Sequence, residues 1–257
     1  EPPRSDDTVF VLHAYYMDVL DETLTRFEEN ELRLPMFITT PEDKAASVHE
    51  ILAAHGRDAE VCPFPNHGRD VLPFLRVLPL LQERGYRYVL KMHTKKSPHR
   101  DDGDVWREEL YRAFADRDKI ERLVNRFDHD PTLGIVGPAS QILPLHDHLE
   151  DNYKHMSRLV QDMGGDLDDA LRSLSFVAGT MFFARLSAFV PLQKLGLTPD
   201  DFETEAGQVD GTIAHAIERV TAVSAAINGR RISLNDCERS VFAARCFPLT
   251  LLLTTVR

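Results

Sequence analysis

The segment Tyr88-Val-Leu-Lys-Met-His-Thr-Lys-Lys-Ser97 joins an apolar strand pattern to a cluster of cationic and hydroxyl side chains. In a chain with a formal net charge of -11, this reversal of sign at the end of a strand favours a phosphate-binding role. The alternative is that the lysines only solvate a loop. The donors of this cationic cluster are Lys91, His93, Lys95, Lys96 and Ser97.

Strand and helix patterns alternate ahead of this segment. Apolar, β-rich runs predict buried strands at residues 8–14, 34–40 and 60–64. Helical spacing predicts helices at residues 19–30, 41–55 and 71–85. This alternation predicts right-handed crossovers and a mostly parallel α/β sheet flanked by helices, with the cationic cluster at the end of its fourth strand.

Polar groups gather at the predicted strand ends. Ligands of parallel α/β sheets bind beyond the carboxyl ends of the strands, and these ends share one rim. The sequence therefore predicts a polar ligand site at this rim. Its parts are the segment from His13 through Tyr15 to Tyr16, the pair Thr39 and Thr40, the loop from Asn66 to Asp70, and the cationic cluster.

The loop Asn66-His-Gly-Arg-Asp70 follows a predicted strand and opens a predicted helix. Its backbone N–H groups and the helix dipole can face an anion, and Gly68 permits close backbone approach. Arg69 can pair with a phosphate or with Asp70, and Asp70 can cap the helix. The alternative is a capped turn with a solvated arginine.

The pattern continues beyond the cluster. The polar segment 97–104 is a candidate mobile lid. Residues 175–185 are apolar on both sides of Gly179-Thr180, which predicts two strands separated by a close-packed turn. Further helices are expected at residues 106–114, 118–127, 149–163 and 209–226, and a short strand at 133–137.

Asp210 lies at the start of the last predicted helix, where His215 and Arg219 form an i, i+4 pair on an adjoining stripe. A carboxylate near a helix start can be an N-cap. It can equally serve as a general base if the fold directs it into a cleft. Both interpretations remain open at this point.

The composition excludes several classes of protein. A pI of about 5.4 argues against a nucleic-acid partner, because a phosphate backbone requires a broadly basic surface. The sequence has no apolar run long enough to span a membrane and no signal-peptide pattern at its start, where residues 1–7 resemble a linker. Three cysteines without metal-ligand spacing fit a reducing cytoplasm.

Motifs distributed in order along the chain resemble those of the rhamnan synthesis protein F family, which consists of bacterial polysaccharide glycosyltransferases. The resemblance rests on the motifs together. They are Asn66-x-Gly-Arg-Asp-x-x-Pro-Phe-Leu75, Lys91-Met-His-Thr-Lys-Lys-Ser97, Trp106-Arg107, Phe176-x-Ala-Gly-Thr-Met-Phe-Phe-Ala-Arg185 and Glu205-x-Gly-Gln-x-Asp-Gly-Thr-x-Ala-His-Ala-x-Glu-Arg219.

The resemblance implies a GT-A-like, Rossmann-type fold in one domain over residues 1–257. Residues 8–138 would form a nucleotide-sugar-binding half, residues 139–230 an acceptor and catalytic half, and residues 231–257 a C-terminal tail. It also implies roles for individual residues. The donor would be cradled by His13, Tyr15 and the loop with Asn66, Gly68, Arg69 and Asp70. The floor of the cleft would be Gly179 and Thr180, and the base would be Asp210 or its competitor Glu205. The remaining pair, His215 and Arg219, would either be structural or contact the acceptor or phosphate.

The resemblance also suggests how the donor diphosphate is held. Many GT-A-like enzymes bind a divalent metal there through two acids, but the corresponding triplet here is His93-Thr94-Lys95. Cations would repel such a metal. We therefore expect no metal cofactor, with His93, Lys95, Lys96 and Arg107 stabilising the leaving diphosphate in its place.

The function implied is transfer of a sugar, such as rhamnose or another deoxyhexose, from a nucleotide-sugar donor to a growing bacterial cell-surface polysaccharide, with inversion. The expected partners are the donor, a glycan or lipid-linked glycan acceptor, and other domains of a longer polysaccharide synthase. The expected location is the cytoplasm, with peripheral attachment at the inner face of the membrane left open. The alternative function is a noncatalytic sugar- or nucleotide-binding module of a polysaccharide assembly protein.

Overall fold

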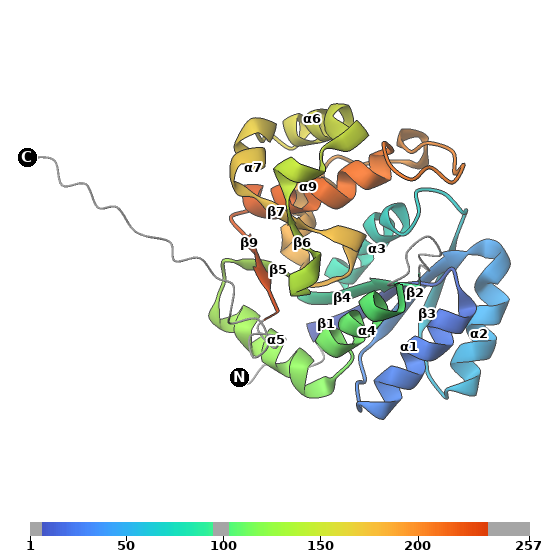
Figure 1. The fold of residues 1–257 in the computed structure, drawn as a ribbon. Helices are drawn as coiled ribbons and strands as arrows, with labels where there is room; N and C mark the ends of the chain where they lie inside the picture. Colours follow the sequence, from blue (N-terminus) through green and yellow to red (C-terminus); the bar gives the residue numbers. More distant parts are fainter. Residues whose placement is uncertain (1–6, 95–102, 236–257) are drawn as a thin grey trace, which may run out of the picture.

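A seven-stranded sheet forms the centre of the computed structural model, which describes residues 7–94 and 103–235 (Figure 1). The strand order is β3-β2-β1-β4-β8-β5-β9, and β8 alone runs antiparallel to its neighbours in this sheet. The predicted α/β class, with a mostly parallel sheet flanked by helices, is confirmed. The strands are β1 (Thr8–His13), β2 (Met36–Pro41), β3 (Glu60–Phe64), β4 (Tyr88–His93), β5 (Leu133–Gly137), β8 (Phe182–Arg185) and β9 (Arg231–Leu234).

Helices cover both faces of the sheet because alternate strand residues point to opposite sides. Phe10 and Leu12 of β1 belong to a core shared with α1, α2, α4 and α5, whereas Val9 and Val11 belong to one shared with α3 and α9. A third core joins α9 to α6 and α7, which lie on the side of α9 that faces away from the sheet (Figure 1). The helices are α1 (Met17–Glu29), α2 (Ala45–Ala54), α3 (Val71–Glu83), α4 (Gly103–Phe114), α5 (Arg117–His129), α6 (Tyr153–Asp162), α7 (Leu167–Ser173), α8 (Val190–Gln193) and α9 (Ile213–Ile227).

The later part of the chain differs from expectation in three places. The two strands predicted within residues 175–185 exist, but β7 (Ser175–Val177) pairs with β6 (Ile142–Pro144) in a separate small sheet. The last long helix begins at Ile213 instead of residue 209, because Gly207 and Gly211 have positive φ angles that interrupt a helix. The C-terminal tail predicted at residues 231–257 begins with a strand, β9, which pairs with β5 and extends the sheet.

Two other expectations concern the organisation of the chain. Residues 97–102 of the candidate lid lie outside the described residues, and α4 begins at Gly103. The division into halves at residue 138 stays a prediction. The main sheet takes β8 and β9 from the chain beyond that position, so strands from both sides of it share one sheet.

The β4 strand leads from this core into the polar rim. All of its six residues are buried, including Lys91 and His93. The first two members of the cationic cluster therefore need partners inside the protein.

Candidate functional site

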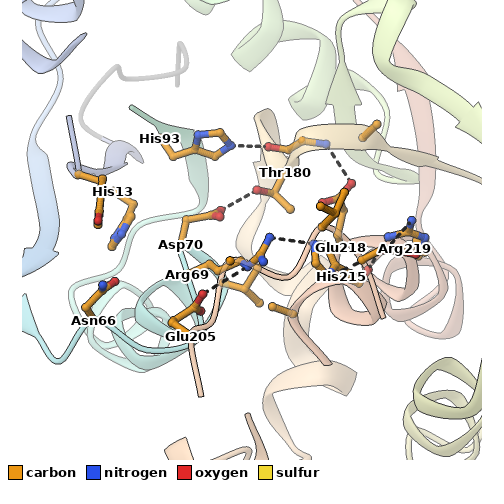
Figure 2. Close-up of a pocket in the computed structure, with 18 of the residues that line it drawn as sticks. His13, Asn66, Arg69, Asp70, His93, Thr180, Glu205, His215, Glu218 and Arg219 are labelled. Atoms are coloured by element: carbon orange, nitrogen blue, oxygen red, sulfur yellow. Dashed lines mark hydrogen bonds and ion pairs between the residues drawn. The ribbon is translucent and has the colours of Figure 1, made fainter. Parts of the chain in front are cut away.

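A cavity of about 960 Å³ opens at the carboxyl ends of β1 and β4. The loop between β3 and α3 bounds one side, and residues 205–219 bound the other (Figure 2). This is the rim at which the polar strand ends were predicted to meet. The predicted site residues that line the cavity are His13, Tyr15, Asn66, Arg69, Asp70, His93, Gly179, Thr180, Glu205, Asp210, His215 and Arg219.

Lys91 does not line the cavity, although we predicted it as a donor ligand. Its side chain is 3% exposed, and its Nζ lies 2.5 Å from Oδ2 of Asp70. The same ammonium donates to the carbonyl oxygen of Thr180 at 3.0 Å and to the Thr180 hydroxyl at 3.1 Å. A buried ammonium must be paired, and Lys91 finds its partners beneath the cavity instead of in it.

Asp70 is ionised by this environment. Burial by itself would raise the pKa of Asp70, but the charges of Lys91 and His93 and the hydrogen bonds from Lys91 and Thr180 lower it well below its usual range. The Thr180 hydroxyl donates to the same Oδ2 at 2.6 Å. Asp70 is the N-cap residue of α3, as predicted, but its side chain makes no capping hydrogen bond.

The turn at Gly179 and Thr180 lines the cavity, and Thr180 is labelled in Figure 2. Both residues adopt left-handed backbone conformations, with φ angles of 81° and 53°. The Nε2 of His93 donates to the Gly179 carbonyl at 2.7 Å, and the Gly179 N–H donates to Oε1 of Glu218 at 3.1 Å. His93 therefore lines the cavity while its Nε2 is hydrogen-bonded to the Gly179 carbonyl.

His13 lies at the end of β1, where its Nδ1 is 3.0 Å from the hydroxyl of Thr39. Burial is the main cause that lowers the pKa of His13 to about 4, helped by the charges of His93 and Lys91 and opposed by Asp70. The imidazole is therefore neutral near pH 7. A neutral imidazole can accept or donate a hydrogen bond to a ligand.

Arg69 connects the two sides of the cavity. Its Nη1 lies 2.8 Å from Nε2 of His215, its Nη2 donates to the carbonyl oxygen of Gln208, and its Nε is 3.7 Å from Oε2 of Glu205 (Figure 2). Because a guanidinium only donates, the Nε2 of His215 must be the acceptor. The turn just before Arg69 requires a glycine at position 68, because Gly68 has a positive φ angle and a Cβ atom there would lie 2.5 Å from the Leu72 Cβ.

Asp210 is held from two sides and is not a helix cap. Its Oδ2 accepts from the Asn152 side chain at 2.7 Å, and its Oδ1 lies 3.3 Å from Nη2 of Arg219. The N-cap of α9 is instead Thr212, whose hydroxyl lies 2.8 Å from Nδ1 of His215. The N-cap interpretation of Asp210 is therefore wrong, and its carboxylate faces the cavity.

Other predicted donor ligands lie elsewhere. The Nε of Arg107 is 3.1 Å from Oε2 of Glu22 on α1, and Arg107 does not line the cavity. This placement corrects the expected phosphate role, because the acid on the neighbouring helix draws Arg107 away. Gly68 shapes the loop without lining the cavity. Lys95 and Lys96 lie outside the described residues.

Several lining residues were not predicted as site residues. Glu218 belongs to the last quoted motif and follows His215 by three positions on α9, and this helical spacing was the signal that could have indicated it. Tyr16 adjoins the predicted rim segment. Gln141 and Asp151 lie in short 3-10 helices, and only the tertiary fold brings them to the cavity.

Two further properties bear on the kind of site. Within residues 7–94 and 103–235, no three His, Cys, Asp or Glu side chains are grouped as ligands for a metal ion. None of the helices in the same ranges has the length and apolar character needed to cross a bilayer.

Comparison with known proteins identifies relatives along most of the chain. The family model of rhamnan synthesis protein F matches residues 4–229. Two proteins of Xanthomonas campestris pv. campestris are each 41% identical over 229 residues. Both are described as uncharacterized protein WxcX, one from strain B100 and the other from a second strain. These 229 residues are 89% of this chain but 33% of each relative, so the chain spans about a third of their length.

A solved structure was also found to be similar. It is the crystal structure of 4-diphosphocytidyl-2C-methyl-D-erythritol synthase, with 13% sequence identity and a TM-score of 0.37. The alignment covers 75% of this chain and 85% of that chain.

Proposed function

Because the chain belongs to the rhamnan synthesis protein F family, as its motifs indicated, we propose that it is a glycosyltransferase. A role in polysaccharide synthesis fits that family. The proposed reaction moves a sugar, rhamnose or another deoxyhexose, from a nucleotide-sugar donor to a growing bacterial cell-surface polysaccharide. The proposed transfer inverts the anomeric centre and needs no divalent metal.

One observation supports this proposal most directly: both candidate carboxylates line the same cavity as the polar strand ends. Asp210 and Glu205 share this cavity with His13, Asn66 and His93. The cavity volume of about 960 Å³ falls within the range of pockets that bind small molecules and cofactors. A carboxylate that merely solvated the surface would not need the partners that hold Asp210 in place.

In the proposed mechanism, Asp210 removes the proton from the acceptor hydroxyl while that oxygen attacks the anomeric carbon of the donor. The bond from that carbon to the diphosphate breaks, and the nucleoside diphosphate leaves with the bonding electrons. Arg69, together with Lys95 and Lys96, stabilises the developing negative charge. Glu205 is the competing candidate for the base.

Nucleotide binding is the first test. Thermal unfolding of the full chain is followed with UDP, GDP, dTDP and CMP, since a ligand of the folded state raises the unfolding temperature with its concentration. We expect one nucleotide to stabilise the protein both with and without EDTA. Stabilisation that requires Mn²⁺ would contradict the metal-independent mechanism.

The base is tested by Asp210→Asn and Glu205→Gln, with sugar transfer from the matching nucleotide sugar as the assay. Asp210→Asn should lower kcat by about 100-fold or more with nucleotide binding nearly unchanged. The control is Asp162→Asn, which changes an exposed acid of α6. Full activity of Asp210→Asn, with a large loss in Glu205→Gln, would transfer the role to Glu205. Nucleotide binding without turnover in the wild type would favour the noncatalytic module.

A further inference from the structure

The buried contacts of Lys91 join three segments that are distant in the sequence. Lys91 belongs to β4, Asp70 to the loop before α3, and Thr180 to the turn between β7 and β8. Lys91 is 21 positions from Asp70 and 89 positions from Thr180. The loop and the turn are both parts of the cavity wall, so one ammonium group sets the spacing between them.

The hydrogen-bonding capacity of Lys91 is fully used in this arrangement. An ammonium group has three N–H donors. Its three contacts are the Asp70 carboxylate, the Thr180 carbonyl and the Thr180 hydroxyl. The rings of Phe74 and Phe182, 5.4 and 5.8 Å away, lie around it. Movement toward a ligand in the cavity would leave the Asp70 carboxylate without its main partner, which is strongly unfavourable for a buried charge.

Thr180, which Lys91 contacts, has an unusual backbone conformation. A φ angle of 53° is uncommon for a β-branched residue and persists only where surrounding contacts fix it. Lys91 donates to both the carbonyl and the hydroxyl of Thr180, and that hydroxyl in turn donates to Asp70. His93 and Glu218 hold the adjoining Gly179 peptide in the same turn.

We propose that Lys91 is a positioning residue and does not bind donor phosphate. Through Asp70 and Thr180 it fixes the Gly179-Thr180 turn against the loop from Asn66 to Asp70. This inference rests on the proposed glycosyl transfer for its effect on turnover. The wall spacing set by Lys91 determines how close the donor and the acceptor come, because small displacements of reacting groups cost large factors in rate.

The test compares the full chain with Lys91→Met, Lys91→Met/Asp70→Asn and Thr180→Val. The control is Lys194→Met, an exposed lysine after α8. Three quantities are measured: the unfolding temperature, the calorimetric dissociation constant of whichever of UDP, GDP, dTDP and CMP stabilises the wild type, and kcat for transfer. The double variant serves because Lys91→Met alone leaves a buried unpaired carboxylate.

We expect Lys91→Met to lower the unfolding temperature and the double variant to recover at least half of that loss. In folded Lys91→Met or the double variant, and in Thr180→Val, the nucleotide dissociation constant should stay within threefold of the wild-type value. Over the same variants kcat should fall by tenfold or more, as the turn loses a contact that holds it. The Lys194→Met control should match the wild type in all three measurements.

Two results would overturn the proposal. One is a tenfold or larger rise in the nucleotide dissociation constant of folded Lys91→Met, which would make Lys91 a phosphate ligand. The other is a double variant that is no more stable than Lys91→Met, which would show that the two side chains are not a buried pair. The unfolding comparison still decides the pairing if no nucleotide binds and no sugar is transferred, so failure of the proposed function is distinguishable from failure of this inference.

Discussion

His13 combines a largely enclosed imidazole with a position at the edge of the cavity. Its pKa, lowered by burial to about 4, lies below the ordinary value of 6.5. The unfolded chain therefore takes up a proton at this residue at a higher pH than the folded chain does. The linkage favours unfolding as the solution is acidified between these two values, and the contribution of His13 to stability is complete above pH 6.5.

The free energy of unfolding should thus fall by up to about 3 kcal/mol between pH 6.5 and pH 4 through His13. His13→Asn, which has no group titrating in this range, should remove most of that fall. Urea unfolding of both proteins at several pH values measures the difference. His55, whose pKa is raised by hydrogen bonds to Asp21 and Glu28 against the effect of burial, loses its contribution as the pH rises, and it cancels in the comparison.

An equal fall of stability in His13→Asn and the wild type would contradict this assignment. Asp70 does not disturb the measurement. Its pKa is lowered below the ordinary value of 3.8, so its contribution is present above pH 3.8 and is lost only in stronger acid.

The start of α1 depends on a side chain from another element. Tyr16 is its N-cap but provides no side-chain cap, and the N–H groups of Tyr15 and Tyr16 instead donate to the Thr94 hydroxyl at 2.7 and 2.8 Å. Thr94 follows β4 and is fully buried. The first turn of α1 is therefore attached to the end of a neighbouring strand.

Thr94→Val should lower the free energy of unfolding by about 2 kcal/mol, because two backbone N–H donors lose their acceptor while the shape of the side chain is kept. Thr94→Ser retains the hydroxyl and should lose less than half as much. Urea unfolding at pH 7 compares the three proteins. A loss in Thr94→Ser as large as that in Thr94→Val would assign the effect to packing of the methyl group instead.

Elements with a strong local pattern could be predicted from the sequence, and contacts between distant elements could not. The buried strands and the polar rim followed from apolar runs and from the rule for parallel sheets. The insertion of β8 between β4 and β5 depends on pairing across the whole chain. Lys91 and Arg107 were predicted as phosphate ligands because the sequence does not reveal that Asp70 and Glu22 lie beside them.

At the scale of the whole molecule, β8 makes the sheet continuous. It pairs with β4 from Tyr88 to Lys91 and with β5 on its other side. The ring of Phe183 in β8 lies 5.9 Å from that of Tyr88 and 5.2 Å from that of Phe127, in the core beneath α5. The predicted first half therefore shares its core with a strand from the second.

A fragment of residues 1–138 should consequently not fold on its own. Removal of β8 leaves the edges of β4 and β5 unpaired and exposes the aromatic side chains that Phe183 covers. We expect the fragment to aggregate or to unfold without a cooperative transition, whereas the full chain unfolds cooperatively. Circular dichroism and size-exclusion chromatography of both provide the measurement. A monomeric fragment with a sharp transition would support two independent halves.

The position of β8 also has a consequence during protein synthesis. β4 leaves the ribosome well before its partner, since Lys91 and Thr180, which lies two residues ahead of β8, are 89 positions apart. At about 5–20 residues per second, the nascent chain exposes an unpaired apolar edge for roughly 5 to 20 seconds. An edge of this kind is a template for aggregation. The yield of folded protein in the cell should therefore depend on chaperones that bind the emerging chain until β8 arrives.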